Sequence, residues 1–412
     1  MIQSSKRRIG IIGGGAAGFF AALIAADIDK EAEVIIFEKT RQPLAKVRVS
    51  GGGRCNVTHN CFDPQVLSSH YPRGAESLKK LFYEFQPQDM INWLSDRGVS
   101  LKVEADGRMF PVSNSSSTII DCFVKQAQVL GVQIRLESEI LRIEKTEWGL
   151  TVHTKEDDRI DCDAVLLATG GVQRSYLLAQ GLGHTMMPAV PSLFTFNIKD
   201  LRIDELSGVA VNHVKISIEG SGIHAEGPLL ITHWGMSGPA VLRLSAWAAR
   251  YLSEKEYKGV LVINWVPMLA EHQVREALLE AKRGSASKAI CLTPLFALPK
   301  NLWRKVLAHC HILDTKLFAH LSKVDVHELV QSLCHSRFTI DGKSTNKEEF
   351  VTCGGIPWKE INQKTMESKL CKGLYFAGEV VDTDGITGGF NFQNAWTTGW
   401  IAAHAMTHRV EV

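Results

Sequence analysis

The sequence predicts an α/β fold in which both ends of the chain build one parallel-sheet domain, interrupted by a β-rich insert and a small helical insert. Three observations predict this class. A short apolar run near the N-terminus leads into a glycine-rich turn and an apolar helix. Two later apolar runs, at 164–171 and 373–379, also end in small residues. Between them, alternation of apolar and polar residues indicates half-buried strands.

Composition narrows the function classes. The 412 residues are enough for about two to three domains at roughly 150 residues each. An apolar fraction of 45% excludes a disordered chain. The 46 Lys and Arg nearly balance the 44 Asp and Glu. Because a nucleic-acid-binding protein usually shows a basic excess or a basic run, this balance predicts no nucleic-acid partner.

Cysteine usage bears on redox setting and on metals. The nine cysteines are scattered, and no two form a C-x-x-C pair. This pattern favours a reducing, cytoplasmic setting and argues against a zinc site or a redox dithiol. His309-Cys310-His311 contains metal-ligating types, but neighbouring residues on a helix point about 100° apart. We therefore predict no metal site.

The N-terminus begins as a secretory signal would. Lys6-Arg7-Arg8 precedes an uncharged stretch from Ile9 to Ala26. Three consecutive glycines from Gly13 interrupt this stretch and disfavour a signal or membrane helix. No other run is long enough to cross a bilayer, so we expect no membrane partner.

A dinucleotide-binding motif explains the same stretch better. A strand is predicted at Ile9–Ile12, and residues 13–18 then read Gly-Gly-Gly-Ala-Ala-Gly, a complete G-x-G-x-x-G. A helix predicted for Ala17–Ala26 and a strand at Glu33–Phe37 follow, and Glu38 ends that strand 20 residues after Gly18. Strand, glycines, helix, strand and acid in this order predict a dinucleotide site.

Each part of the motif has a physical role. Gly13 permits the tight turn, Gly15 lets the backbone approach a pyrophosphate, and Gly18 allows close packing of helix on strand. The N–H groups of the helix N-terminus, at Ala16 and Ala17, would hold the phosphates. Glu38, with Lys39 beside it, would contact the ribose of the adenosine half. Since a carboxylate repels a 2′-phosphate, FAD or NAD is favoured over NADP.

The C-terminal part favours FAD over NAD. FAD is the longer molecule, and its ribityl hydroxyls need an acceptor far from the adenine. Glu379, which follows Gly378 at the end of the strand 373–379, can supply one. Gly388 and Gly389 would let the backbone approach the isoalloxazine ring. The N–H groups that open the last helix, predicted from about Asn394 to His408, would face the ring's pyrimidine edge. Five further cofactor contacts are expected at Ala168, Thr169, Gly170, Asn391 and Phe392.

Several motifs resemble known flavoproteins. They are Lys-Val-Arg-Val-Ser-Gly-Gly-Gly-Arg-Cys-Asn at 46–56, Gly-Arg-Met-Phe-Pro at 107–111, Thr-His-Trp-Gly-Met-Ser-Gly-Pro at 232–239, Gly-Gly-Ile at 354–356 and the C-terminal run. The chain resembles the glutathione-reductase-type Rossmann-like FAD fold and, more narrowly, the family of aminoacetone oxidase and the bacterial bile-acid dehydro-reductases. The resemblance spans nearly the whole chain, most weakly between 271 and 334. It implies FAD, inserts in the flavin domain and redox chemistry, without a particular substrate. It also favours cofactor contacts from Lys46, Gly52, Gly53, Arg54, Cys55 and Asn56.

The middle of the chain defines the inserts. Alternation at 214–218 and the apolar run 259–266 predict strands, whereas 271–283 has helical spacing. Asp325 to Glu328 has the form of a capping box that opens a helix to Cys334. We therefore expect an FAD-binding domain at 1–190 and 352–412, a β-rich insert at 191–270 and 335–351, and a helical insert at 271–334.

Two residues are candidates for substrate chemistry. His233 lies between a strand and a glycine-rich turn, where it could donate a proton; a hydrogen-bonded structural histidine is the alternative. Arg108 follows a turn and could bind an anionic substrate or only end a strand. Ser237 could cap a helix predicted for Pro239–Tyr251. The substrate pocket is expected where the flavin meets the insert through the turn 233–238.

The sequence therefore predicts an FAD-dependent oxidoreductase acting on a small organic molecule. It could be an oxidase, or a reductase that takes hydride from NAD(P)H and reduces an enone-like alkene. No second G-x-G-x-x-G follows a strand, so a dedicated nicotinamide domain is not expected. An FAD-dependent RNA-modifying protein and a non-catalytic flavin redox sensor are the alternatives. Substrate, electron donor and oligomeric state stay open.

Overall fold

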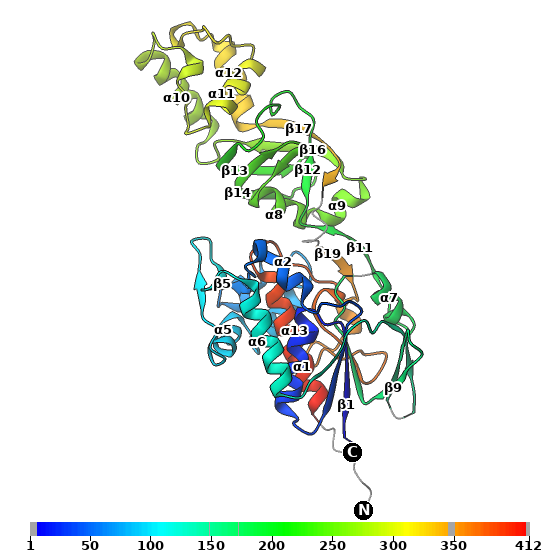
Figure 1. The fold of residues 1–412 in the computed structure, drawn as a ribbon. Helices are drawn as coiled ribbons and strands as arrows, with labels where there is room; N and C mark the ends of the chain where they lie inside the picture. Colours follow the sequence, from blue (N-terminus) through cyan, green and yellow to red (C-terminus); the bar gives the residue numbers. More distant parts are fainter. Residues whose placement is uncertain (1–5, 148, 172, 345–350, 409–412) are drawn as a thin grey trace, which may run out of the picture. The chain divides into compact units, whose positions relative to one another are not determined.

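Both ends of the chain contribute to one five-stranded parallel sheet in the computed structural model (Figure 1). The structure describes residues 6–147, 149–171, 173–344 and 351–408. The strand order is β20-β10-β1-β2-β6, and every neighbouring pair is parallel. Apart from the edge strand β6, which is half-exposed, these strands are apolar runs because they are buried. Their bounds are β1 Arg8–Ile12, β2 Glu33–Phe37, β6 Gln133–Arg135, β10 Ala164–Leu167 and β20 Leu374–Phe376.

Helices from distant parts of the chain lie together beside this sheet (Figure 1). They are α1 Ala16–Ile28, α6 Ser116–Val129 and α13 Phe390–Thr407. The Phe20 ring of α1 lies 5.6 Å from the Trp396 ring of α13 and 6.1 Å from the Phe123 ring of α6. A Cβ added at Gly399 would lie 2.8 Å from the Ala17 carbonyl oxygen, so α1 and α13 approach closely.

Helix α13 begins four residues earlier than the sequence predicted. Its N-cap is Gly389, whose φ of 95° is left-handed, and the helix starts at Phe390 instead of Asn394. No side chain caps this end. The glycine turns the chain into the helix without the Ser, Thr, Asp or Asn signal on which a sequence-based start depends.

The remaining elements of this unit flank the parallel sheet. Three antiparallel strands, β7-β8-β9, form one small sheet, and β3-β5-β4 form another. Strand β11 pairs with β19. The bounds are α2 Ala45–Gly53, β3 Thr58–His59, α3 Pro64–Ser68, α4 Ala75–Leu81, α5 Pro87–Ser95, β4 Leu101–Val103, β5 Arg108–Pro111, β7 Ile140–Lys145, β8 Leu150–Thr154, β9 Arg159–Cys162, α7 Gln173–Gln180, β11 Met187–Ser192, β19 Val351–Gly355 and the 3-10 helices η3 Trp358–Glu360 and η4 Gly378–Val380.

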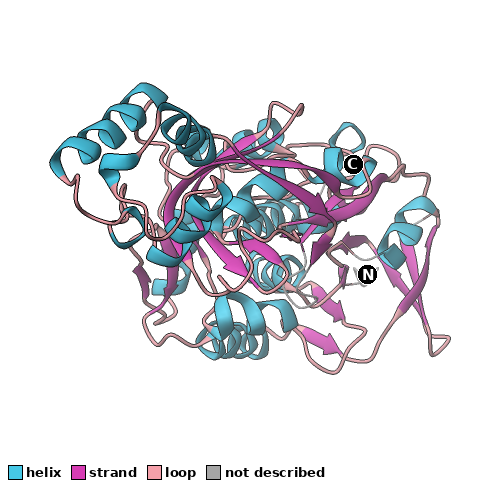
Figure 2. Ribbon diagram, turned by 90° about the horizontal axis from the view of Figure 1, so that it is seen from above, coloured by secondary structure: helices cyan, strands magenta, loops and turns pink. Residues whose placement is uncertain are grey.

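The chain divides into two compact units, residues 1–191 with 347–412 and residues 192–346. The second unit has a seven-stranded sheet in the order β17-β16-β13-β14-β15-β12-β18, whose long strands are visible in Figure 2. Its elements are β12 Thr195–Asn197, β13 Ala210–Ile218, β14 His224–Thr232, β15 Gly235–Ser237, α8 Pro239–Trp247, α9 Ala249–Glu254, β16 Lys258–Asn264, β17 Ser336–Asp341 and β18 Lys343–Ser344.

Two sequence-based expectations for this unit are corrected. The single helix predicted for Pro239–Tyr251 is two helices, α8 and α9, separated at Ala248. The N-cap of α8 is Gly238, and the helix has no side-chain cap from Ser237. Pro239 at the first helical position explains why the helix starts there without such a cap.

The helical part of the second unit contains α10 Glu271–Gly284, α11 Lys300–His309 and α12 Lys323–Cys334, with the 3-10 helices η1 Ile290–Leu292 and η2 Phe318–His320. The residue that caps α12 is Ser322, and Asp325 is the third helical residue of the same capping box. The sequence placed the start of this box at Asp325, three residues too late. One hydrophobic core includes Ile263 of the sheet and Trp303 and Leu329 of the helices. The division of this unit into a β-rich and a helical insert stays a prediction.

No helix in the described parts of the chain combines the length and apolarity that a bilayer crossing requires.

Candidate functional site

The carboxyl ends of β1, β2 and β10 meet at one edge of the parallel sheet, where backbone segments approach too closely for side chains. Gly13 has a φ of +108°, and a Cβ there would lie 2.6 Å from the Ala168 carbonyl oxygen. A Cβ at Gly18 would lie 2.1 Å from the Gly13 carbonyl oxygen. Both glycines are therefore required by the packing of α1 on the strands.

Gly15 differs from its two neighbours in the motif. It is the N-cap of α1, with ordinary φ and ψ of −83° and −169°. A Cβ there would meet no atom within 4 Å. The first N–H groups of α1, which include those of Ala16 and Ala17, have no partner within the helix. Open space beside these N–H groups suits a pyrophosphate.

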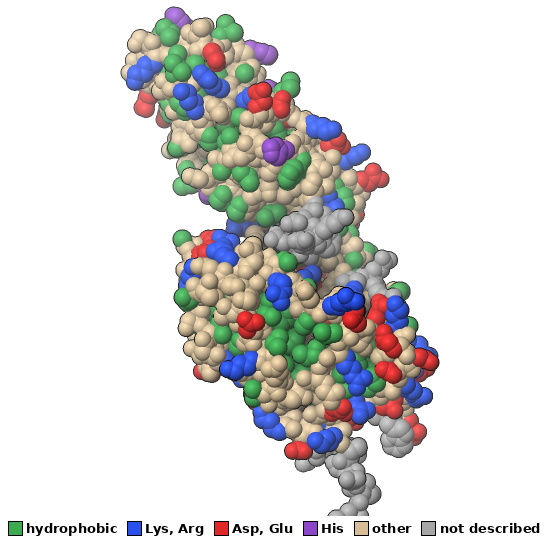
Figure 3. Space-filling model, in the orientation of Figure 1, with side chains coloured by type: hydrophobic (Ala, Val, Ile, Leu, Met, Phe, Trp, Pro, Cys, Tyr) green, Lys and Arg blue, Asp and Glu red, His purple; other side chains and the backbone are tan. Residues whose placement is uncertain are grey.

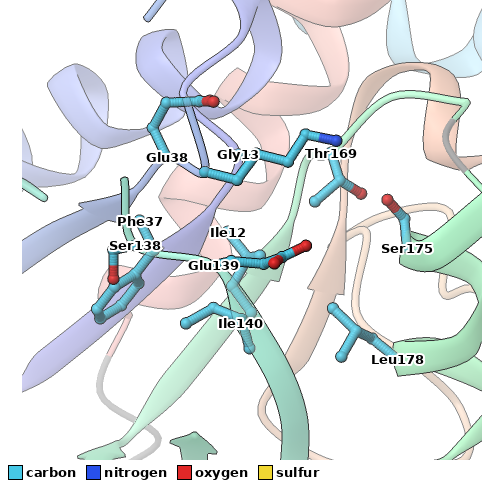
Figure 4. A pocket seen from close by; sticks show the side chains of 11 residues that line it. Ile12, Gly13, Phe37, Glu38, Ser138, Glu139, Ile140, Thr169, Ser175 and Leu178 are labelled. Atoms are coloured by element: carbon cyan, nitrogen blue, oxygen red, sulfur yellow. The ribbon is translucent and has the colours of Figure 1, made fainter. Parts of the chain in front are cut away.

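A pocket lies beside Gly13 at the ends of β1, β2 and β10 (Figure 4). Figure 4 shows the Thr169 and Ser175 hydroxyls and the Glu139 carboxylate around the same space. The Thr169 hydroxyl is buried and has no hydrogen-bond partner. The residues that line the pocket are Ile12, Gly13, Phe37, Glu38, Lys39, Ser138, Glu139, Ile140, Thr169, Ser175 and Leu178. The pocket therefore brings together Gly13 and residues 38–39, which the sequence assigned to the pyrophosphate turn and the adenosine ribose, and Thr169, which it assigned to FAD without naming a part of the cofactor.

The Glu38 carboxylate is held in place by backbone and side-chain donors. Its Oε2 accepts a hydrogen bond of 2.8 Å from the Gly14 N–H. Its Oε1 accepts from the Thr40 N–H at 2.8 Å and from the Thr40 hydroxyl at 2.7 Å. A carboxylate has about four lone-pair sites, so one that accepts three hydrogen bonds keeps a site for a ribose hydroxyl.

The predicted ribityl site joins the N-terminal and C-terminal motifs. Lys46 on α2 forms an ion pair with Glu379 at 2.7 Å, although the two residues are 333 positions apart. A Cβ at Gly378 would lie 3.0 Å from the Ala17 Cβ, and one at Gly170 would lie 3.5 Å from Glu379 Oε2. Strands β10 and β20 thus bring Gly170 and Glu379 beside the start of α1.

Two further glycines face open space. Gly52 and Gly53 have left-handed φ values of 68° and 82°, and a Cβ at either would meet nothing within 4 Å. The kink in α2 at Ser50, Gly51 and Gly52 produces this exposed glycine turn. Like Gly15, these glycines leave room for a ligand to touch the backbone.

The glycines expected at the flavin ring are packed against protein. A Cβ at Gly389 would lie 2.5 Å from the Thr58 carbonyl oxygen, and one at Gly388 would lie 2.8 Å from the Phe390 ring. Strand β3 therefore explains the glycine at 389, and the Phe390 ring explains the glycine at 388. The Asn56 amide, oriented with its oxygen toward the Gly389 N–H at 2.9 Å, ties this turn to the segment 46–56.

The first turn of α13 contains the other predicted contacts. Asn391 exchanges two hydrogen bonds with the Gly385 backbone, at 2.8 and 2.9 Å. Phe392 stacks on Trp396 with 5.6 Å between ring centroids. One turn later, Asn394 is fully buried, and neither its amide oxygen nor its amide nitrogen has a partner. A buried amide without partners is costly, and the Asn394 amide can donate to and accept from a polar ligand beside α13.

These observations fit FAD. Open space at Gly15, Gly52 and Gly53 would accept phosphates or a ring against the backbone. The unpartnered Thr169 hydroxyl and Asn394 amide would gain partners from a polar cofactor. Thr169 lines the pocket beside Gly13, and Asn394 lies on α13. Buried polar atoms without a partner therefore occur both near the glycine-rich turn and on the helix expected beside the flavin ring.

Arg54 and Arg108 share one carboxylate. Glu104 pairs with Arg54 at 2.6 Å and with Arg108 at 3.2 Å, and Asp106 pairs with Arg108 at 2.8 Å. The Arg54 guanidinium also lies 4.0 Å from the centroid of the Phe110 ring. The two arginines are therefore fixed in position, and their guanidinium groups can bind an anion.

Cys55 and His233 have opposite exposure. Cys55 is fully buried, and burial raises the pKa of its thiol to about 12, so it stays protonated and unreactive. His233 lies with Trp234 in the turn between β14 and β15, and its ring is exposed. The structure therefore gives His233 no buried hydrogen-bonding role in the second unit.

Several residues near the candidate site were not predicted from the sequence, because only tertiary contacts bring them there. His59 pairs with Arg108 across β3 and β5, and its Nδ1 lies 3.0 Å from the Gly388 carbonyl oxygen. Burial lowers the pKa of His59. Glu104 and Ser138 had no local motif to mark them. Asn394 did have a signal, since an Asn within the apolar run of α13 is unusual. No group of three or more His, Cys, Asp or Glu is arranged to hold a metal within the described residues.

Comparisons with known proteins agree with this fold. The family described as the HI0933-like protein Rossmann domain matches residues 7–405. The ribosomal RNA dihydrouridine synthase of Escherichia coli (strain K12) is 31% identical over 95% of this chain and 96% of its own length. The 3-dehydro-bile acid delta(4,6)-reductase of Clostridium scindens is 29% identical over 98% and 99%. A flavocytochrome c3 fumarate reductase in its open conformation shares the fold at a TM-score of 0.50 and 17% identity, covering 98% of this chain and 78% of that one.

Membership of this family confirms the expected Rossmann-like fold and the expected cofactor. The narrower resemblance to the family of aminoacetone oxidase is not confirmed, although a bile-acid reductase is among the relatives. The chain binds FAD and is a flavoprotein oxidoreductase, and it belongs to the HI0933-like Rossmann-domain family.

Proposed function

We propose that this protein is an FAD-dependent reductase of a carbon–carbon double bond conjugated to a carbonyl group, and that its substrate is a uracil base in ribosomal RNA. One observation carries the proposal. Relatives with two different names match this chain from end to end at nearly equal identity, 31% and 29%. Dihydrouridine is uridine saturated at C5–C6, beside the C4 carbonyl. A delta-4 double bond in a 3-oxo steroid is likewise conjugated to its carbonyl.

The reactions that the two names describe thus reduce the same kind of bond, a carbon–carbon double bond conjugated to a carbonyl group. Reduced FAD supplies a hydride to the carbon distal to the carbonyl. The protein must then hold the base, exclude water and deliver a proton to the carbon next to the carbonyl. Arg54 and Arg108, fixed by Glu104, are proposed to anchor an anionic part of the substrate. His233, whose ring is exposed, is the proposed proton donor.

The cofactor contacts proposed from the sequence have support from geometry. Gly15, Gly52 and Gly53 leave space against the backbone. Glu38 directly follows β2, whereas β20 ends at Phe376, three residues before the predicted strand end, and Glu379 lies in η4. NAD(P)H is the proposed electron donor, acting transiently because the chain has no second dinucleotide motif.

A small conjugated enone is the second candidate substrate, favoured by the relative that reduces a bile acid and covers 98% of this chain. Both candidates use the same flavin chemistry and differ only in what the protein must bind. RNA requires an extended cationic surface, whereas a steroid requires an apolar pocket.

The test is anaerobic. The purified holoenzyme is bleached with NADPH or NADH, and then an unmodified in vitro transcript of ribosomal RNA or a 3-oxo-delta-4 steroid acid is added. We expect the transcript to reoxidise the flavin and to gain two hydrogens per modified uridine, as measured by nucleoside mass spectrometry. Reoxidation by the steroid alone would select the second candidate. Reoxidation by oxygen alone would overturn both candidates in favour of an oxidase.

A further inference from the structure

The helical part of the second unit contains a long stretch without acidic residues. Glu280 and Asp314 bound residues 281–313, which contain no Asp or Glu and six Lys or Arg. In a chain with a formal net charge of only +2, this is a marked local excess of positive charge. The six cations are Lys282, Arg283, Lys288, Lys300, Arg304 and Lys305.

Four of these cations are free to contact a ligand. Arg283, Lys288, Lys300 and Arg304 are exposed, and none forms an ion pair with another described residue. The other two are engaged. Lys282 donates to the Leu321 carbonyl oxygen at 2.7 Å, and Lys305 lies 3.4 Å from Glu205. We call the four free residues the basic stretch.

The local fold holds the basic stretch on one rigid support. Leu302, Trp303, Val306 and Leu307 bury the opposite face of α11, which leaves Lys300 and Arg304, one helical turn apart, on the solvent side. The Trp303 indole donates to the Ile290 carbonyl oxygen at 2.8 Å, tying α11 to the segment that follows Lys288. Figure 3 shows Lys and Arg side chains, with Asp and Glu side chains among them, over the part of this unit that contains α10 and α11.

We infer that the basic stretch is an RNA-binding surface that contacts the phosphate backbone. This inference rests on the proposed function, because a uracil in ribosomal RNA must be presented by a polyanion. Exposed cations without partners lose no intramolecular ion pair when they meet phosphates, and they release the counterions condensed on RNA. Such contacts position the RNA without reading its sequence.

The test measures RNA binding without turnover. The variant Arg283→Gln/Lys288→Gln/Lys300→Gln/Arg304→Gln removes four charges from the basic stretch. The control Lys155→Gln/Lys359→Gln/Lys364→Gln/Lys372→Gln removes four exposed charges from the first unit, so both proteins have the same net charge. The probe is a fluorescent, unmodified transcript of ribosomal RNA, titrated between 50 and 200 mM salt, a range in which about six to ten phosphate contacts change affinity strongly.

We expect the first variant to bind the transcript at least about tenfold more weakly, with a log–log salt slope shallower by about 3, since each lost phosphate contact removes about 0.7–0.9. The control should bind within about twofold of wild type. FAD content and melting temperature report whether each protein is folded. The inference is overturned if both variants bind the transcript equally more weakly than wild type, or if neither binds it more weakly.

Two further arms separate the alternatives. If the basic-stretch variant loses binding to phosphatidylglycerol vesicles but still binds RNA like wild type, the basic stretch binds a membrane surface and the inference is overturned. The proposed function fails independently if wild-type enzyme binds the transcript through this surface but never forms dihydrouridine. In the converse case, dihydrouridine forms while the basic-stretch variant binds RNA normally, so the function stands and the surface is wrong.

Discussion

Replacing Gly15 by valine should remove FAD without unfolding the protein. Gly15 has φ and ψ values that valine adopts readily, and a Cβ there meets nothing within 4 Å. The new side chain would therefore fit the protein and occupy the space beside the first N–H groups of α1. That space is where a pyrophosphate is proposed to lie.

The magnitude follows from the contacts that would be lost. Hydrogen bonds to a charged group contribute about 1.5–3 kcal/mol each. Displacing the pyrophosphate from two N–H groups would then cost about 3–6 kcal/mol, or about 10²- to 10⁴-fold in FAD affinity. A flavoprotein weakened this far should lose its cofactor on a column, since affinity tuning acts mainly through the dissociation rate.

The assay compares FAD content from the visible spectrum with folding from circular dichroism and thermal melting. Gly284→Val is a matched control, because a Cβ at Gly284 also meets nothing within 4 Å but lies at the end of α10 in the second unit. Gly18→Val is the contrasting control and should fail to fold, since its Cβ would lie 2.1 Å from the Gly13 oxygen. A Gly15→Val protein that is purified with wild-type FAD content would refute the placement of the pyrophosphate.

Three other predictions concern single side chains. Glu38→Ala should weaken FAD binding by about tenfold or more, the equivalent of one charged hydrogen bond, in titrations of the apoprotein that stays folded. His233→Ala should slow turnover while FAD content and spectrum stay unchanged; wild-type turnover would remove it from the chemistry. The buried His184, bonded to Glu360 at 2.9 Å and to Ser368 at 2.8 Å, should make the protein less stable in acid. Burial lowers the pKa of His184, so the unfolded chain takes up a proton below about pH 6.5 that the folded chain resists, and the melting temperature should fall from there downward, less so in His184→Gln.

The parallel sheet and its nucleotide edge could be predicted because each signal is local. β2 has the predicted bounds, and β1 and the helix after Gly15 differ from expectation by one or two residues. Apolar runs, glycines and a terminal acid are contiguous in sequence, so the short-range rules apply directly. The start of α13 was missed because Gly389 enters the helix through a left-handed turn without a polar cap.

The parts of the site that could not be predicted depend on long-range contacts. Glu104 joins Arg54 to Arg108, and His59 reaches the Gly388 carbonyl, only because β3 and β5 pair and lie against the turn before α13. Arg54 and Glu104 are 50 positions apart and His59 and Gly388 are 329 apart, and no spacing rule connects residues at such separations. The same holds for Lys46 and Glu379, each recognised in its own motif but not as partners.

A net charge averaged over the whole chain can conceal a strongly basic surface. The whole-chain balance of 46 basic and 44 acidic residues favours no nucleic-acid partner, yet residues 281–313 contain six cations and no acid. Phosphate contacts act over about one Debye length, roughly 8–10 Å at physiological salt, so an RNA senses the local face and not the sum over the chain. The acidic residues at 156–158 belong to the other unit, and the sum over the chain counts them as fully as the residues of α11. A window of about 30 residues is therefore the appropriate scale for this test of nucleic-acid binding.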